Sequence, residues 1–447
     1  MRMNLFKNLF TNPELRKRFL FTLGLLVIYR LGIHVSVPGV NAQALTESLR
    51  QQGGGLFDVI NLFSGGALKK FSVFALGITP YITASIVFQL MSAVVPSLEQ
   101  LQKKEGEAGR EKINQWTRYA TVLLAFIQGF GIAALAQSQG PDVVANPGMS
   151  FRLLTAFTLA TGTIFIMWIG EQITDRGIGN GISLLIFSGI VVGLPQGVYT
   201  LFTMFSKSLT NATDVPPAGV FLLLLASMIA VLLVVVMVEN AYRRIPIHYA
   251  RRTDSASMAS QKSSYLPLKL NTSGVMPVIF AQSVIFFPAT IASFTKWEWL
   301  ARMSAYINPS IHFWIYTPVF IAIVIFFAFF YTSIVFNPDE TAENMKRSGG
   351  YIPGIRPGQE TSIYMDSVLS KLTFGGAIYL GLISLVPLVI LNNINGLNFY
   401  YGGTSLLIIV GVAMDTVSQL ESYTVMRQYD GFVTRGRVPG RSSGLNP

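Results

Sequence analysis

Residues 215–238 read VPPAGVFLLLLASMIAVLLVVVMV and contain no charged side chain. About 20 apolar residues are enough for an α-helix to cross the hydrocarbon core of a bilayer. The whole chain has the same character, because 51% of its residues are hydrophobic and only 12% are charged. A soluble domain carries about twice that share of charged residues. The sequence therefore predicts an integral membrane protein built from helices.

Similar uncharged stretches recur along the whole chain. They are residues 71–98, 119–141, 153–170, 177–206, 270–295, 303–338 and 372–414. The last stretch is long enough for two spans, and residues 392–403 within it are rich in Asn, Gly and Tyr, which indicates a loop. With residues 19–37 added, we predict ten transmembrane helices.

The basic residues predict how these spans are oriented. Lys and Arg collect on the cytoplasmic side of a membrane protein. With the amino terminus inside, the cytoplasmic segments hold 25 of the 33 Lys and Arg residues. The outer segments, together with the outer end of the first span, hold 8. We therefore expect both termini in the cytoplasm. The first residues, MRMNLFKNLFTNPELRKRF, precede an ordinary span and show no cleavage site, so we do not expect a secretory signal.

The outer segment after the first span differs from the other outer loops. Residues 56–63 (LFDVINLF) are mostly apolar and lie between Gly53-Gly54-Gly55 and Ser64-Gly65-Gly66. They are too few to cross a bilayer. An apolar piece facing water is unfavourable, so one interpretation is a re-entrant segment that folds back into the protein. A short amphipathic helix on the membrane surface explains the residues equally well.

Signals of enzymatic chemistry are missing from the sequence. There is no cysteine, and the three histidines, His34, His248 and His312, are too far apart in the chain to suggest a metal site. No Gly-x4-Gly-Lys-Ser/Thr loop is present, so we expect no nucleotide hydrolysis by this chain. Residues 177–181 (GIGNG) lack the preceding strand of a phosphate-binding loop, which favours a turn between two spans.

Eight motifs, in their order along the chain, resemble the SecY family of protein-translocation channels. They are residues 61–66 (NLFSGG), 74–82 (FALGITPYI), 105–110 (EGEAGR), 177–183 (GIGNGIS), 243–251 (RRIPIHYAR), 267–271 (PLKLN), 352–358 (IPGIRPG) and 402–408 (GGTSLLI). The resemblance extends from residue 14 to about residue 437. One departure is the tip of the central loop, residues 253–262 (TDSASMASQK), which lacks the basic residues and the glycine pair usual in bacterial members. Its small polar residues predict a flexible tip.

The resemblance implies an all-α membrane protein of ten helices in two pseudo-symmetric halves of five around a central pore, with a short re-entrant plug helix. The expected segments are a cytoplasmic amino-terminal segment (1–18), a first half (19–206), a second half (207–422) with cytoplasmic loops 239–269 and 339–371, and a cytoplasmic tail (423–447). Residues 56–66 correspond to the plug: Leu56, Phe57, Asp58, Val59, Ile60, Asn61, Leu62, Phe63, Ser64, Gly65 and Gly66.

Six isoleucines match the ring at the waist of the pore in this family: Ile78, Ile82, Ile186, Ile190, Ile279 and Ile408. Ile78 and Ile82 are four residues apart, as are Ile186 and Ile190, so each pair shares one face of a helix. Apolar constrictions close a pore by excluding water. Without the resemblance, isoleucines in membrane spans more often face lipid or pack against neighbouring helices.

The resemblance also implies a function and a set of partners. The expected function is passage of unfolded secretory polypeptides, recognised by their signal peptides, and lateral release of hydrophobic helices into the lipid bilayer. The gate would open between spans two and three on one side and seven and eight on the other. SecE and SecG are the implied membrane subunits of the inner (plasma) membrane complex, and the SecA ATPase or a translating ribosome supplies the energy, so we expect no enzyme and no cofactor. The residues expected to contact the motor or ribosome are Arg243, Arg244, Arg251, Arg252 and Arg356.

The roles of two residues and one rival function stay open at this point. Arg356 is either a coupling residue, as the family implies, or one more basic residue on the cytoplasmic side. Asp415, an acid near the inner third of the last span, is either functional or structural. A secondary transporter of a small solute is the rival function. It would need charged groups at the membrane midplane, and spans two, three, four, five, seven and eight have none in their middle sections.

Overall fold

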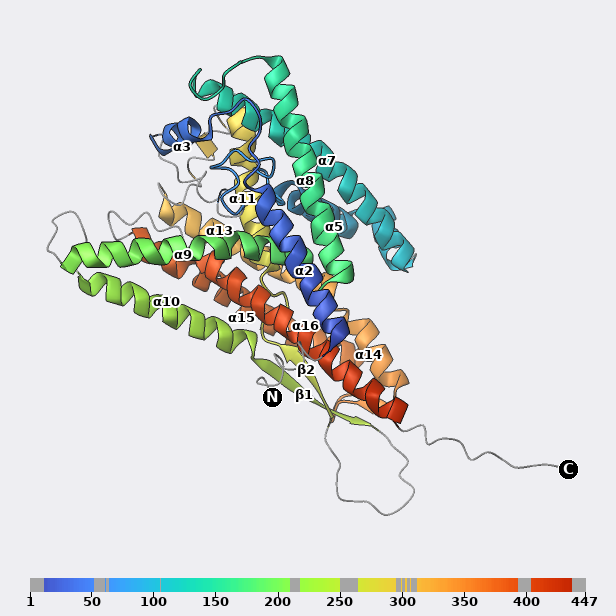
Figure 1. The fold of residues 1–447 in the computed structure, drawn as a ribbon. Coiled ribbons are helices and arrows are strands. Elements are labelled where there is room, and N and C mark those ends of the chain that lie inside the picture. The colour runs from blue at the N-terminus through green and yellow to red at the C-terminus, as the bar shows by residue number, and fades with distance from the viewer. Residues whose placement is uncertain are drawn as a thin grey trace, which may run out of the picture.

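The computed structural model describes residues 12–51, 61, 64–104, 106–209, 218–249, 264–294, 299, 302–303, 306, 312–392 and 403–435. The chain is mostly helical in this part (Figure 1). The long helices are α2 (Pro13–Gly32), α5 (Thr79–Val94), α7 (Gly106–Ser138), α8 (Met149–Arg176), α9 (Gly181–Leu209), α10 (Ala218–Glu239), α11 (Met276–Phe294), α13 (Phe313–Val335), α15 (Gln359–Asn392) and α16 (Gly403–Arg435). Shorter helices are α3 (Ala42–Gln51), α6 (Pro96–Lys104) and α14 (Pro338–Arg347).

Each of the ten predicted spans overlaps one of the long helices. Within the described residues, six helices are long and apolar enough to cross a membrane: Glu107–Ser138, Met149–Arg176, Gly181–Ser208, Phe313–Arg347, Gln359–Val386 and Thr404–Thr424. The prediction of a mostly helical chain with several membrane-length apolar helices is confirmed.

The second predicted span is wrong at its beginning. Residues 71–78 were expected to be helical, but they form turns, and α5 starts only at Thr79. Phe71 and Gly77 have positive φ angles of 43° and 57°, which a right-handed helix does not allow. Pro80 lies in the first turn of α5, where a missing backbone N–H does no harm.

Residues 239–269, expected to be a loop, contain strands. Strand β1 (Tyr242–Tyr249) pairs antiparallel with β2 (Ser264–Lys269) and with the short β3 (Gly350–Tyr351), in the order β2-β1-β3. Alternate side chains of β1, Ile245 and Ile247, are buried in a small separate core with residues from α14 and from the first turns of α15. The sheet therefore joins the segment before α11 to the segment before α15.

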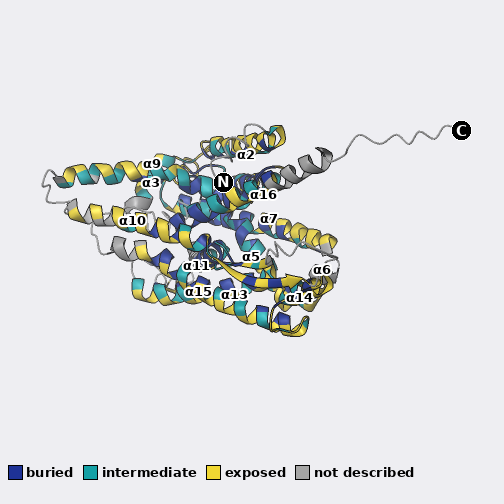
Figure 2. Ribbon diagram, turned by 90° about the horizontal axis from the view of Figure 1, so that it is seen from below, coloured by how far each residue is buried: buried dark blue, intermediate teal, exposed yellow. Residues whose placement is uncertain are grey.

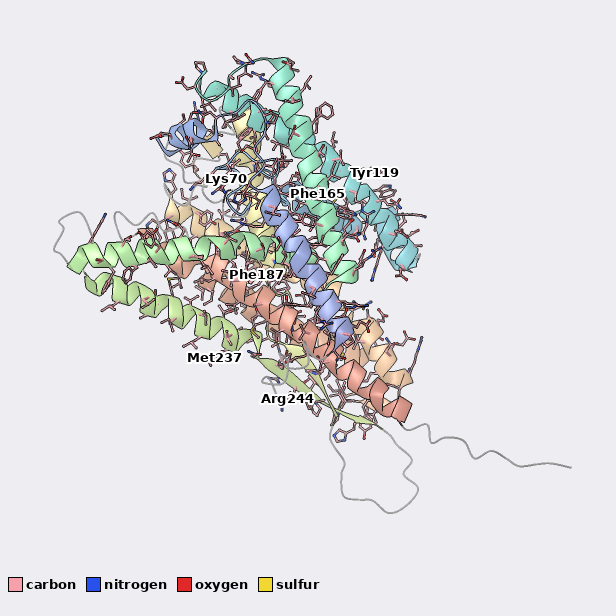
Figure 3. The ribbon with its side chains drawn as sticks, in the orientation of Figure 1. Lys70, Tyr119, Phe165, Phe187, Met237 and Arg244 are labelled. Carbon is pink, nitrogen blue, oxygen red and sulfur yellow. The ribbon has the colours of Figure 1, made fainter. Side chains whose placement is uncertain are left out.

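Helices from the two predicted halves, residues 19–206 and 207–422, pack against each other. Helix α11 lies against both α5 and α7, and α16 lies against α9. Buried residues gather toward the middle of the bundle in Figure 2, and exposed residues cover outward sides of α9, α10 and α13. Large exposed side chains on the outside include Tyr119 on α7 and Met237 on α10, both 72% exposed and labelled in Figure 3. Apolar side chains on the outside suit a bundle surrounded by lipid.

Residues 177–180 form the predicted turn between α8 and α9, and this turn is hydrogen-bonded to the first and the last long helix. The Ile178 N–H donates to Thr22 Oγ1 of α2 at 3.0 Å. The Gly179 N–H donates to Gln419 Oε1 of α16, also at 3.0 Å. The Asn180 side chain caps α9 by accepting from the N–H groups of Ile182 and Ser183. The turn thus links the first, middle and last long helices.

Candidate pore constriction and basic contact surface

All six isoleucines of the predicted ring are buried in one hydrophobic cluster. Their exposed fractions lie between 0% and 7%: Ile78 6%, Ile82 7%, Ile186 2%, Ile190 0%, Ile279 3% and Ile408 0%. Ile78 is the N-cap residue directly before α5, and the others lie on α5, α9, α11 and α16. The structure therefore buries within one large cluster residues that are as far as 330 positions apart in the chain.

Packing between helices accounts for the burial of these side chains. Helix α5 packs against α11, which carries Ile279, and α9 packs against α16, which carries Ile408. The i, i+4 spacing puts Ile186 and Ile190 on the same side of α9. The expected shared helix face is wrong for the other pair, because Ile78 precedes the first residue of α5. The cluster extends beyond these six residues into the surrounding helices, so the ring forms one part of a larger apolar core.

The predicted plug is described only in part. Leu56, Phe57, Asp58, Val59, Ile60, Leu62 and Phe63 lie outside the described residues, whereas Asn61 and the link Ser64-Gly65-Gly66 lie within them. Ser64 and Gly65 are buried. A Cβ added to Gly65 would lie 2.9 Å from the Cα of Gly189, and one added to Gly77 would lie 3.5 Å from the Cα of Ser64. The link therefore lies against Gly77 and Gly189, the residues directly before Ile78 and Ile190.

Three of the five predicted contact arginines belong to one sheet and the loop that follows it. Arg243 and Arg244 are exposed on β1, and Arg356 is exposed in the loop after β3. The guanidinium of Arg244 lies 5.0 Å from the ring centre of Tyr265 on β2, a cation–π contact that orients the side chain. The backbone carbonyl of Arg356 accepts a hydrogen bond from Thr361 Oγ1 at 2.8 Å. Arg251 and Arg252 lie outside the described residues.

A polar network that the sequence reasoning missed lies where α10, β2, α11 and α16 meet. Buried Glu239 accepts a hydrogen bond from Asn271 Nδ2 at 2.7 Å. Beside it, Lys269 Nζ lies 3.5 Å from Asp415 Oδ1, with both side chains partly exposed. These four residues line a cavity of about 620 Å³. Asp415 is thus an ion-pair partner at the rim of a polar cavity, and the carboxylate that is buried is Glu239.

A sequence signal for this network did exist. Glu239 is the first charged residue after the long apolar segment 215–238, and Asn271 lies in the PLKLN motif. No residue pattern indicates that the two side chains meet, since they are 32 positions apart and belong to different segments. Among the residues that the structure describes, no three His, Cys, Asp or Glu side chains are grouped so as to bind a metal ion.

Comparisons with known proteins agree with this architecture. The family model named SecY matches residues 72–417. The protein translocase subunit SecY of Escherichia coli K12 is 45% identical over 434 residues, covering 96% of both chains. The corresponding subunit of Aquifex aeolicus is 42% identical over 96% of this chain and 99% of its own.

Solved structures share the fold at low sequence identity. The structure of a protein-conducting channel superposes with a TM-score of 0.68 at 17% identity and covers 94% of each chain. Sec61 in the canine ribosome–channel complex from the endoplasmic reticulum gives a TM-score of 0.64 at 17% identity, again over 94% of each chain. The sequence identity to the curated subunits and the family match together show that this chain belongs to the SecY family of protein translocase subunits.

Proposed function

We propose that this chain forms the pore of a protein-conducting channel. It passes unfolded secretory polypeptides across the membrane and releases hydrophobic helices sideways into the bilayer. The observation that carries the proposal is the burial of the six isoleucines, from four segments of the chain, in one hydrophobic cluster. The chain is also 45% identical to a protein translocase subunit. A collar of aliphatic side chains excludes water at rest and adapts its shape to an extended peptide.

The proposed architecture has ten spans in two halves, residues 19–206 and 207–422, with the pore between them. The overlap of each span with a helix supports it, as does the packing of α5 and α7 against α11. The lateral gate lies between α5 and α7 on one side and α11 and α13 on the other. Residues 56–66 act as a plug, and the contact of Gly65 with Gly189 supports a position next to the ring.

The chain is proposed to lie in the inner (plasma) membrane with both termini and the sheet β2-β1-β3 in the cytoplasm. One exposed basic surface then contacts the SecA motor or a ribosome, and it includes Arg243, Arg244 and Arg356. Two solved structures of the same fold come from channels bound to ribosomes, which supports the ribosome as a partner. SecE and SecG complete the complex, and the energy for transport comes from the partner bound at the basic surface.

Reconstitution tests the proposal. The chain is assembled with SecE and SecG in proteoliposomes and supplied with SecA, ATP and a preprotein that carries a signal peptide. We expect a share of the preprotein to become resistant to added protease, and none in vesicles that lack the chain or with a preprotein whose signal peptide is deleted. Full protease sensitivity together with uptake of a small solute would instead support the transporter interpretation.

A further inference from the structure

Arg30 is a charged residue in a place that membrane topology does not explain. It lies in the last turn of α2, at the end opposite the proposed cytoplasmic amino terminus. The positive-inside rule places basic residues on the cytoplasmic side, so it does not account for this arginine. A charged side chain within or at the edge of a span is unfavourable unless it has a partner, and such residues are functional hypotheses by default.

The partner of Arg30 is the backbone of the link that follows the proposed plug. Its Nη1 donates a hydrogen bond to the carbonyl oxygen of Gly65 at 2.8 Å, across 35 positions of sequence. Hydrogen bonds from a charged donor are shorter and stronger than neutral ones. Arg30 itself is half-buried, which limits competition from water.

The same glycine is held from a second side by α9. Gly65 has φ +65°, a left-handed conformation that favours glycine, and an added Cβ would lie 2.9 Å from Gly189 and 3.2 Å from Arg30 Nη1. Its neighbour Ser64 is 3% exposed and its hydroxyl donates to the carbonyl of Asn61 at 3.1 Å. Residues 64–66 are therefore held between α2 and α9, beside the isoleucine ring.

We propose that Arg30 is a positioning residue that holds the link 64–66 against α9 in the resting channel. This inference rests on the proposed function, in which residues 56–66 close the pore. The guanidinium acts through its bond to the Gly65 carbonyl, which holds the link beside Gly189, the residue before Ile190. Loss of that bond removes the hydrogen bond between the link and α2 and leaves the packing contacts with Gly189 and Gly77.

The absence of cysteine from the chain makes a direct test simple. Ser64→Cys introduces a single thiol at a buried position of the link, and Ser72→Cys introduces one at a position that is 0% exposed, outside the link. Labelling by a water-soluble maleimide is then measured in membrane vesicles without any preprotein. We expect Arg30→Gln to raise the labelling rate at position 64 about tenfold, because hydrogen bonds to charged groups are among the stronger ones, and to leave position 72 unchanged.

Arg30→Lys and a pair of glycine variants separate positioning from general loosening. Arg30→Lys keeps the charge and a donor, so it should restore most of the protection at position 64. Gly65→Ala and Gly66→Ala both place alanine at a positive φ, but only Gly65 faces α9, since nothing lies within 4 Å of a Cβ at Gly66. We therefore expect Gly65→Ala to expose position 64 more than Gly66→Ala does. The double variant Arg30→Gln/Gly65→Ala should add little to the larger single effect, because both changes act on one contact.

Two results would overturn the inference. Unchanged labelling at position 64 in Arg30→Gln would show that the bond does not position the link. An equal rise at positions 64 and 72 would show that Arg30 only stabilises the fold. Neither result depends on transport, so the reconstitution experiment would still decide the proposed function separately.

Discussion

Asn271 donates a hydrogen bond from Nδ2 to Glu239 Oε1 at 2.7 Å, with both residues more than nine-tenths buried. The bond ties the last residue of α10 to the chain segment that leads into α11. Asn271→Ala would leave a buried carboxylate without this donor, so we expect a loss of about 1–3 kcal/mol in the free energy of unfolding. Thermal unfolding of the detergent-solubilised protein measures the loss. Glu239→Gln is the matched control because it keeps an acceptor for Asn271, and an equal loss in that variant would contradict this explanation.

The isoleucine ring predicts a barrier to ions that depends on apolar side chains. The double change Ile190→Asn with Ile408→Asn adds two polar groups that hydrogen-bond water at the constriction. We expect a higher resting conductance in planar bilayers and export of preproteins with less hydrophobic signal peptides. A single Ile→Val change should do little, since the surface stays apolar.

A matched pair of isoleucines tests whether the position within the core matters. Ile166 and Ile173 are buried in the same cluster but lie on α8, outside the proposed ring. Changing both to Asn should destabilise the protein without opening a conducting path. Equal conductance in the two double variants would mean that any polar group in this core lets water in, and the ring would have no special status.

The proposed plug predicts a leak when it is removed. Deletion of residues 56–66 should leave a folded channel with raised ion conductance, because the segment no longer fills the outer side of the constriction. Replacing residues 56–63 with an equally long Gly/Ser segment keeps the Ser64-Gly65-Gly66 link and should leak as well. Unchanged conductance in both variants would identify the segment as a helix on the membrane surface.

Charge reversal on the basic surface separates coupling from topology. Arg356→Glu should reduce SecA-driven export by at least tenfold while insertion of the channel into the membrane stays near normal, because the residue is exposed and its side chain has no packing role in the sheet core. Arg347→Glu is the control: this arginine is also exposed but lies on α14, paired with Glu343 at 2.6 Å. Equal losses of export and insertion in Arg356→Glu would assign that residue to topology or folding.

The sequence predicted the helices well because long apolar segments have few other stable structures in a bilayer. It predicted their ends less well. Helix α7 begins at Gly106, 13 residues before the predicted span, and α16 continues to Arg435, beyond Met414. Hydropathy marks only the part of a helix that is in contact with lipid. A helix that continues into water keeps its backbone hydrogen bonds but loses the apolar pattern.

The sheet and the contacts of Arg30 were not predicted, for different reasons. In β1, the alternation of Ile245 and Ile247 with polar residues is short and is interrupted by Pro246, so it gives a weak strand signal. Arg30 was counted only as a basic residue on the outer side. Its hydrogen bond to Gly65 depends on a backbone conformation at a glycine 35 positions away, and no residue pattern specifies that geometry.

The bond from the Gly179 N–H to Gln419 Oε1 also has a consequence during biosynthesis. The donor and acceptor are 240 residues apart in the chain. At about 5–20 residues per second, a ribosome needs roughly 12–48 s to make that stretch. Throughout this time the turn between α8 and α9 lacks the partner that finally receives its N–H. This contact between the α8–α9 turn and α16 therefore forms only after α16 has been synthesised, which leaves a long interval in which helper proteins can act on the incomplete chain.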